Sequence, residues 1–213
     1  MNLRIKDVSK QIKGESVLQH INLEMNGGNI YGIYGKNGSG KTMLLRCISG
    51  IANINSGQII CDGQKLHKDI DILPNMGLLI ENVSFWRMYT GFDNLKMLSR
   101  IRGEIGDEQI CEAMKLVGLN PGLKKNVGKY SLGMRQKLAI AQAIMEYPDV
   151  ILLDEPTNAL DEKSVERFRR IMLMEKERGA LIVIASHNKE DIELLSDVKI
   201  HVKNGQIGEY KTL

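Results

Sequence analysis

A glycine-rich stretch near the amino end of the chain combines residue types that bind phosphate groups. It consists of Gly35, Lys36, Asn37, Gly38, Ser39, Gly40, Lys41 and Thr42. This stretch fits the pattern G-x-x-x-x-G-K-[ST] at every specified position, with a strand expected before it and a helix after it. Glycines let successive backbone N–H groups surround a phosphate, and a helix start adds a positive field. We therefore predict a nucleotide site rather than a chance glycine-rich turn, with Lys41 reaching the β- and γ-phosphates and the Thr42 hydroxyl coordinating Mg²⁺.

Two adjacent carboxylates, Asp154 and Glu155, follow an apolar run at 150–153. The carboxyl ends of strands in α/β sheets border the crevice in which ligands bind. We expect Asp154 to hold Mg²⁺ through a water molecule, and Glu155 to orient and deprotonate the attacking water as a general base. The alternative, a solvated acid after a strand, is the weaker interpretation because the phosphate-binding pattern occurs in the same chain.

The elements that must position these residues follow from the spacing of apolar side chains. Strands are expected at 3–8, 21–25, 29–34, 57–62, 150–153 and 180–185, and a hairpin over 199–208. Helices are expected at 43–48, 93–102, 107–117, 134–145, 162–178 and 189–195. Strands that alternate with helices predict a mainly parallel sheet covered on both faces. We expect one domain over 1–213, with a core of 1–81 and 148–213 and an inserted helical lobe at about 82–147.

The composition excludes several classes of protein. The chain has 213 residues, of which 43% are apolar and 26% charged, as in ordinary folded proteins. Its net charge of +3 is too small to indicate a nucleic-acid binder. No apolar run approaches the roughly 18 residues of a membrane span, and the start lacks the apolar segment of a secretory signal. The three cysteines (Cys47, Cys61 and Cys111) lack C-x-x-C spacing, and the four histidines lack metal-type spacing.

The order of the remaining motifs is informative. Tyr130, Ser131, Leu132, Gly133 and Met134 precede a predicted helix. The segment 152–161 then runs from the apolar strand through the two carboxylates to Asp161, and His187 follows the strand expected at 180–185. Together with the glycine-rich loop, these motifs resemble the ABC ATPases over about residues 3–210. Residues 130–134 are similar to the signature motif of that family, residues 152–161 to its Walker B strand and D-loop, and His187 to its switch histidine.

The resemblance implies a fold and a mechanism. The fold would be α/β, a P-loop NTPase (RecA-like) core with an N-terminal antiparallel β portion and the inserted helical lobe. Two such domains, identical or different, would pair head to tail, with each ATP between one P-loop and the partner's Ser131 and Gly133. Asp161 would couple the two sites, and His187 would contact the γ-phosphate and act with Glu155. The resemblance thus implies an ATP hydrolase that uses ATP and Mg²⁺.

Two motifs depart from the usual family pattern in ways that bear on the substrate. Leu132 and Met134 replace a glycine and a glutamine of the signature motif, and this variant resembles ATPases of drug and peptide exporters. Glu81 stands where a glutamine is expected in the Q-loop, as in bacitracin-resistance and lantibiotic-immunity exporters. A carboxylate would ligate Mg²⁺ more strongly than an amide, so Glu81 is expected at the metal and the catalytic site. The alternative is a surface acid misaligned by one or two positions.

A third departure concerns the nucleotide base. Ile12 occupies the place where an aromatic side chain usually stacks on adenine in this family. Stacking on an aromatic is worth about 1–3 kcal/mol per base, and contact with Ile12 or Val17 would contribute less. We therefore predict loose selectivity between ATP and GTP.

An aromatic cluster lies where the chain passes from the core into the expected lobe. Phe85, Trp86, Tyr89 and Phe92 fall within eight residues. In ABC ATPases this junction receives the coupling helix of a membrane partner, whereas the alternative is that the aromatics form the core of the lobe. We expect a mixture, with Phe92 packed inside and Trp86 or Tyr89 partly outward.

We interpret the chain as the nucleotide-binding subunit of an ABC exporter. It would lie on the cytoplasmic face of a membrane and energise export of a peptide antibiotic, a lantibiotic or a drug-like molecule through a separate multi-span permease. Basic residues at 162–178 are balanced by acids, so no nucleic-acid partner is expected. A soluble ABC ATPase that acts on a macromolecule is the alternative. A P-loop kinase would need neither the 130–134 motif nor His187, and Glu155 argues against a binding-only subunit.

Overall fold

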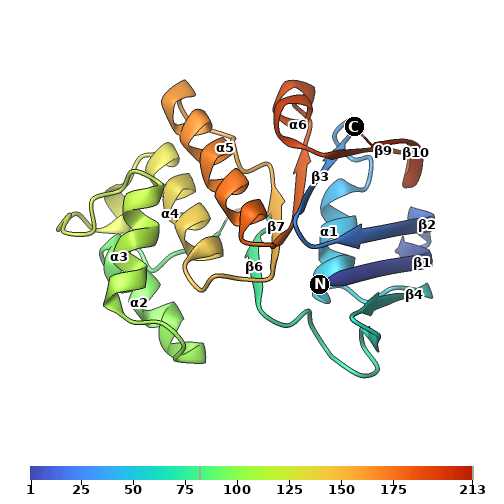
Figure 1. Cartoon of the computed structure of the whole chain (residues 1–213), viewed down its shortest axis with the longest axis horizontal. Helices are drawn as coiled ribbons and strands as arrows, with labels where there is room; N and C mark the ends of the chain where they lie inside the picture. The colour runs from blue at the N-terminus through green and yellow to red at the C-terminus, as the bar shows by residue number, and fades with distance from the viewer. Residues whose placement is uncertain (82, 213) are drawn as a thin grey trace.

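The computed structural model describes residues 1–81 and 83–212, and the side chains of all of these except Asp191 and 209–212. Asn82, the first residue of the expected helical lobe, lies outside the described residues. The described chain forms two β-sheets at one end and in the middle of the molecule, with a group of helices at the other end (Figure 1). Within the described residues, no helix has both the length and the apolar character needed to cross a membrane.

The central sheet is six-stranded and mainly parallel. Its strand order is β10-β9-β3-β8-β7-β6, and only β10 runs antiparallel to its neighbour. The strands are β3 (Asn29–Tyr34), β6 (Met76–Leu79), β7 (Val150–Asp154), β8 (Leu181–Ser186), β9 (Val198–Lys203) and β10 (Gln206–Thr212). In the register of the sheet, Asp154 lies beside Ala185, and Tyr34 beside Ser186. The segments that follow β3, β7 and β8 therefore emerge at one edge of the sheet.

Alternate residues of the central strands pack into two separate hydrophobic cores. Ile151 and Leu153 of β7 point into a core shared with the helices α4, α5 and α6. Val150 and Leu152 point to the opposite face, which packs against α1 and the second sheet. All residues of β7 are buried. Strands covered on both faces read as continuous apolar runs, which is why this strand was recognisable in the sequence.

The second sheet is four-stranded and antiparallel, with the order β2-β1-β4-β5. Its strands are β1 (Asn2–Ile12), β2 (Glu15–Asn26), β4 (Ser56–Cys61) and β5 (Gln64–Lys65). Buried and exposed residues alternate along much of β1 and β2. The buried residues form the inner face of the sheet and join the core around α1. This sheet holds the strand–loop–helix unit of β3 and α1 (Lys41–Ser49) from one side (Figure 1).

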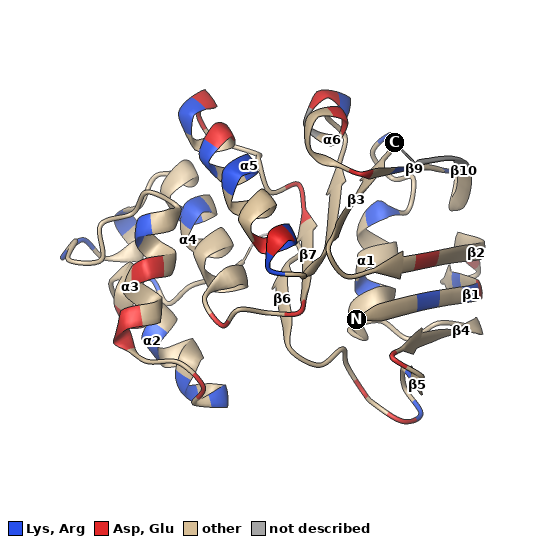
Figure 2. Cartoon of the chain, viewed as in Figure 1, with Lys and Arg blue, Asp and Glu red and all other residues tan. Residues whose placement is uncertain are grey.

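Among the described residues between β6 and β7 are three α-helices, α2 (Gly91–Arg102), α3 (Asp107–Leu116) and α4 (Leu132–Ile144), and a short 3-10 helix, Val127–Lys129. They gather at the end of the molecule away from the antiparallel sheet (Figure 1). A capping box begins α2, since the Thr90 side chain accepts from the Asp93 amide and the Asp93 side chain accepts in return. Helices α5 (Glu162–Glu177) and α6 (Lys189–Leu195) follow β7 and β8. Acidic and basic side chains are interspersed along α5 (Figure 2).

The expected strands and helices correspond to observed elements, and the α/β fold with an antiparallel portion and inserted helices is confirmed. Two strands, β5 and β6, were not expected. β6 has only four residues and contains Gly77, a residue that is depleted in strands. The glycine is required here because a Cβ at Gly77 would lie 1.8 Å from the Ala143 carbonyl oxygen of α4.

Candidate functional site

The P-loop connects the end of β3 to the start of α1 and borders a cavity of about 320 Å³. Gly38 and Gly40 have positive φ angles of 77° and 109°. A Cβ at Gly40 would lie 2.9 Å from the Val17 carbonyl oxygen, so a larger residue would be both strained and crowded. The buried Lys41 ammonium donates to the Gly35 carbonyl at 2.9 Å and to the Lys36 carbonyl at 3.3 Å. The described lining of the cavity comprises Val17, Asn37, Gly38, Ser39, Gly40, Lys41, Thr42, Met43, Arg46, Glu81, Asp154 and Glu155.

Two residues that line this cavity each have a buried side-chain atom with no hydrogen-bond partner among the described residues: Ser39 Oγ and Asp154 Oδ1. The other oxygen of Asp154, Oδ2, accepts from the Thr42 hydroxyl at 2.6 Å. Buried polar groups are normally satisfied, so unpartnered atoms on two residues of one cavity indicate a polar ligand. A hydroxyl and a carboxylate oxygen in contact are a donor set that suits Mg²⁺, which prefers oxygen ligands.

Burial is the main cause that raises the pKa of Asp154 above its usual value, because desolvation disfavours the carboxylate. The hydrogen bond from Thr42 opposes this shift, whereas the nearby Glu155 and Glu81 carboxylates add to it. A bound cation would favour the ionised form.

Glu155 comes directly after β7 and has a positive φ of 48°. Its Oε1 accepts from the His187 amide at 2.9 Å, and its Oε2 lies 2.8 Å from His187 Nδ1. The Ser186 hydroxyl donates to Oε2 at 3.2 Å. The carboxylate is therefore held from the neighbouring β8 end while it lines the P-loop cavity.

Glu81 lies just after β6 and also lines the cavity. Its φ is 56°, a backbone region that non-glycine residues seldom adopt. Glu81 Oε1 pairs with Nη2 of Arg46, a residue of α1, at 2.7 Å. The structure thus brings Glu81 to the cavity that contains Lys41, Thr42 and Asp154, but shows it in an ion pair.

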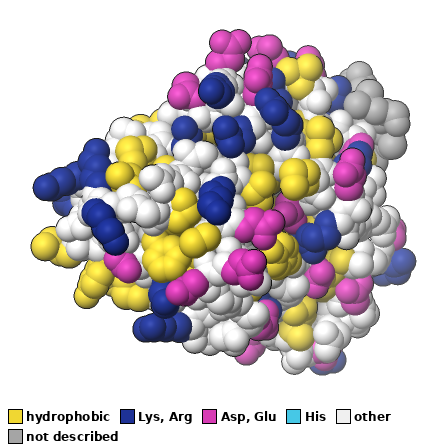
Figure 3. Space-filling view, turned by 60° about the vertical axis from the view of Figure 1, so that its left-hand side comes forward, with side chains coloured by type: hydrophobic (Ala, Val, Ile, Leu, Met, Phe, Trp, Pro, Cys, Tyr) yellow, Lys and Arg dark blue, Asp and Glu magenta, His cyan; other side chains and the backbone are white. Residues whose placement is uncertain are grey.

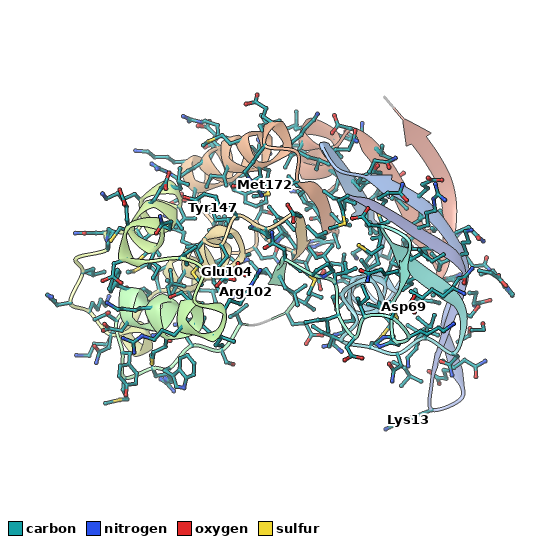
Figure 4. The ribbon with its side chains drawn as sticks, turned by 60° about the horizontal axis from the view of Figure 1, so that its bottom comes forward. Lys13, Asp69, Arg102, Glu104, Tyr147 and Met172 are labelled. Atoms are coloured by element: carbon teal, nitrogen blue, oxygen red, sulfur yellow. The ribbon has the colours of Figure 1, made fainter. Side chains whose placement is uncertain are left out.

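The two residues expected near the base lie in different places. Val17, in β2, lines the cavity, whereas Ile12 is not part of its described lining and is 40% exposed. Ile12 ends β1 next to Lys13, which lies at the tip of a hairpin that extends away from the body of the molecule (Figure 4).

Three other expected residues lie apart from this cavity. Ser131 caps the start of α4, where its hydroxyl accepts from the Met134 amide at 3.2 Å. A Cβ at Gly133 would lie 2.8 Å from the Ala159 carbonyl oxygen, so α4 packs closely on the segment after Glu155. Asp161 caps α5. Hydrogen bonds from Ser164 lower the pKa of the Asp161 carboxyl, and the bond from the Ser164 side chain has a larger effect than the one from its backbone. None of the three belongs to the described lining of the P-loop cavity.

The aromatic cluster is divided between interior and surface. Phe85 and Phe92 pack against the core of the helical end. Trp86 and Tyr89 are 51% and 49% exposed, and Met88 beside them is 79% exposed. Figure 3 shows hydrophobic side chains reaching the surface of this end of the molecule among basic ones. The expected mixture of inward and outward aromatics is therefore observed.

Sequence reasoning missed two polar residues at the site, Arg46 and Ser186. Arg46 is four residues after Thr42 on α1, and helical spacing alone would have placed it on the same face. Ser186 ends β8, beside the residues that follow β7, which the strand order would have indicated. A wider groove of about 780 Å³ runs between α3 and α5 and has none of the expected site residues in its described lining.

A glycine-rich loop between a strand and a helix, in a cavity with two carboxylates from the end of β7, defines a P-loop nucleotide-binding protein. The sequence model of the ABC transporter family matches residues 18–158. The uncharacterized ABC transporter ATP-binding protein YybJ of Bacillus subtilis is 46% identical over 205 residues, which cover 96% of this chain and 94% of that protein. The bacitracin transport ATP-binding protein BcrA of Bacillus licheniformis is 38% identical over 197 residues, or 92% of this chain and 64% of that protein.

Among solved structures, the dimeric structure of MJ0796, a bacterial ABC transporter cassette, has a TM-score of 0.89. It is 24% identical and the alignment covers 99% of this chain and 98% of that one, which supports the fold. The chain belongs to the ABC transporter family, as an ATP-binding subunit of the ABC ATPase type. The resemblance stated from the sequence is confirmed, and so is its classification as an ATP hydrolase.

Proposed function

We propose that this chain hydrolyses ATP to energise an exporter of a peptide antibiotic, a lantibiotic or a drug-like molecule through a separate membrane permease. The contact of Glu155, which lines the P-loop cavity, with His187 is the observation that carries the hydrolytic part. The similarity to a bacitracin transport ATP-binding protein supports the substrate class. Glu81 in the cavity is consistent with the exporters that the sequence resembles.

In this proposal Glu155 is the general base. Its Oε2 lies near His187 Nδ1 and the Ser186 hydroxyl, and its Oε1 accepts a backbone amide, so the carboxylate has a fixed orientation. A base held in this way takes the proton of a water molecule that attacks the γ-phosphate. The buried Lys41 would leave the Gly35 carbonyl to bind the β- and γ-phosphates. Ser39 Oγ and the amides from Asn37 to Thr42 line the cavity in which the phosphates would lie.

Thr42 and Asp154 would hold Mg²⁺, with Glu81 as a further oxygen donor. The unpartnered Asp154 Oδ1 and its neighbour Thr42 Oγ1 suit this role. When bound, Mg²⁺ would neutralise the developing charge on the phosphate oxygens.

The site would be completed by a second ABC ATPase domain, identical or different. Ser131 and Gly133 lie at the start of α4, outside the P-loop cavity of their own chain. A helix start binds phosphate well, so these two residues would meet the γ-phosphate held by the partner. Asp161, close to the segment on which Gly133 packs, would couple the two sites.

The permease would dock on the exposed part of the aromatic cluster, Trp86 and Tyr89, on the cytoplasmic side of the membrane. Aromatic residues are enriched at interface centres, and both side chains are about half exposed in this chain. Trp86 and Tyr89 follow Glu81 closely in the sequence, so a movement of the backbone at the aromatic residues would be passed on to Glu81. The chain would therefore be a peripheral protein of the inner membrane face, with no nucleic-acid partner.

The test is to purify the tagged chain from native membranes in mild detergent and identify the proteins that accompany it by mass spectrometry. We expect a stoichiometric multi-span protein. A chain that stays out of the membrane fraction, or that accompanies ribosomes or DNA, would overturn the transport function. That outcome would favour a soluble ABC ATPase acting on a macromolecule.

A further inference from the structure

We propose that Arg46 is a positioning residue that holds the Glu81 carboxylate in an ion pair, from which Mg²⁺ must draw Glu81 when nucleotide binds. This inference rests on the proposed nucleotide site and assigns a role to a residue that none of the motifs contains.

The position of Arg46 on α1 is the first support. Arg46 is four residues after Thr42, so the two side chains lie one turn apart on the same helix face. Thr42 donates to Asp154, and Arg46 pairs with Glu81. One face of α1 therefore contacts both candidate metal ligands. The Thr42 hydroxyl contacts Asp154, and the Arg46 guanidinium contacts Glu81.

The charges around the cavity are the second support. Glu81, Asp154 and Glu155 line it together with only two cationic side chains among its described lining, Lys41 and Arg46. A negatively charged nucleotide would be repelled by a third uncompensated carboxylate. Arg46 is placed to compensate Glu81, since their atoms are 2.7 Å apart, whereas Lys41 is engaged with P-loop carbonyls.

The geometry of Glu81 is the third support. Its positive φ of 56° turns the chain just after β6, and from there the Glu81 side chain reaches α1. A carboxylate has acceptor oxygens only. An oxygen that is paired with Arg46 therefore binds a cation more weakly than an unpaired oxygen would. The pair and the metal therefore compete for the same group.

The experiment measures binding of the fluorescent nucleotide mant-ATP with saturating Mg²⁺ and with EDTA. The ratio of the two dissociation constants reports how much Mg²⁺ strengthens binding, and it cancels direct effects of a variant on the nucleotide. The variants are Arg46→Met, Glu81→Gln and the double variant. Arg4→Met is the matched control, because it breaks a different exposed ion pair, with Glu24, in the antiparallel sheet.

We expect Arg46→Met to increase the Mg²⁺ enhancement by about threefold or more, because it frees Glu81 for the metal. In the Glu81→Gln background the same substitution should change the enhancement by less than about twofold, since no carboxylate remains to be freed. Arg4→Met should leave it unchanged. Melting temperatures of all variants establish that each is folded.

Two results would overturn the inference. Arg46→Met could leave the enhancement unchanged, or it could change the enhancement equally in both backgrounds, as the loss of one positive charge alone would do. A failure of the proposed nucleotide site would look different, because the unsubstituted chain would then bind no mant-ATP with either Mg²⁺ or EDTA.

Discussion

His187 contacts Glu155 through two of its atoms: its amide donates to Oε1 at 2.9 Å, and its Nδ1 lies 2.8 Å from Oε2. A carboxylate has no proton to donate at neutral pH, so Nδ1 of the imidazole carries the proton of this hydrogen bond. The other ring nitrogen, Nε2, takes no part in this contact. The same contact therefore fixes the orientation of both the base and the histidine.

From this contact we predict that His187→Ala lowers kcat for ATP by about tenfold to 100-fold, because Glu155 loses one of its two contacts with His187 and the imidazole itself is missing. ATP affinity should change little. The measurement is steady-state ATPase activity with mant-ATP binding beside it. His20→Ala is the control, since His20 pairs with Asp7 in the antiparallel sheet at 2.6 Å. Equal loss of activity in both variants would mean that the effect is not specific to the Glu155 contact.

The surroundings of the base predict weak nucleotide selectivity. Val17 lines the cavity, Ile12 is an exposed residue outside its described lining, and that described lining contains no aromatic side chain. We expect kcat/KM for GTP within about fivefold of that for ATP, because aliphatic contact replaces stacking. The measurement is phosphate release with each nucleotide. Strict preference for ATP would show that another group recognises the base.

Asp154 predicts a pH-dependent stability that can be separated from activity. Burial raises the pKa of this carboxyl in the folded chain above its pKa in the unfolded chain. The stability that the protonated carboxyl contributes is therefore fully present below the pKa of the unfolded chain, and it is lost as the pH rises through the pKa of the folded chain. In EDTA at pH 7.5, Asp154→Asn should melt about 2–4 °C higher, the shift that about 1 kcal/mol gives a domain of this size. The difference should shrink as pH falls toward 4.

The same Asp154→Asn variant should lose the Mg²⁺ enhancement of nucleotide binding, because an amide is a weaker ligand than a carboxylate. For the melting temperature in EDTA, Thr42→Val serves as the comparison, since it removes the hydroxyl that contacts Asp154 but leaves the carboxylate buried. A lower melting temperature for Asp154→Asn at every pH would contradict the stated cost of burying this charge.

The exposed aromatics predict a surface that matters to the partner rather than to hydrolysis. Trp86→Ala and Tyr89→Ala should leave the ATPase activity of the isolated chain within about twofold, because neither side chain lines the P-loop cavity. Recovery of the multi-span protein in detergent should fall by about tenfold or more. Leu194→Ala is the control, because Leu194 is also exposed, at 62%, but lies on α6. Unchanged recovery would exclude the cluster as the docking site.

Much of the fold could be predicted from the sequence because its strands and helices carry strong local patterns. The run at β7 is buried on both faces, and the P-loop pattern identifies the end of β3 and the start of α1 without tertiary information. β6 was missed because it contains a glycine, which argues against a strand. The reason for that glycine is the close approach of α4, a contact between segments that are distant in the sequence. Local periodicity cannot report such a contact.

The candidate site divides in a similar way. Lys41, Thr42, Asp154 and Glu155 stand in motifs with a direct chemical reason, and the structure places all four around one cavity. The pairing of Arg46 with Glu81 depends on how α1 meets the end of β6, which only the fold decides. Likewise the hydrogen bond from Ser186 depends on β8 lying next to β7.

The most direct test of the account is the molecular mass of the Glu155→Gln variant, measured by light scattering during size-exclusion chromatography with and without Mg-ATP. The substitution removes the base while it keeps the shape of the side chain, so turnover should fall by about 100-fold or more with ATP still bound. We predict a mass of two chains with ATP and one chain without it, because in the proposed dimer Ser131 and Gly133 of each copy would complete the other's site. A variant that hydrolyses ATP as fast as the unsubstituted protein would contradict the account, and a variant that binds ATP as a single chain would exclude a dimer of identical chains.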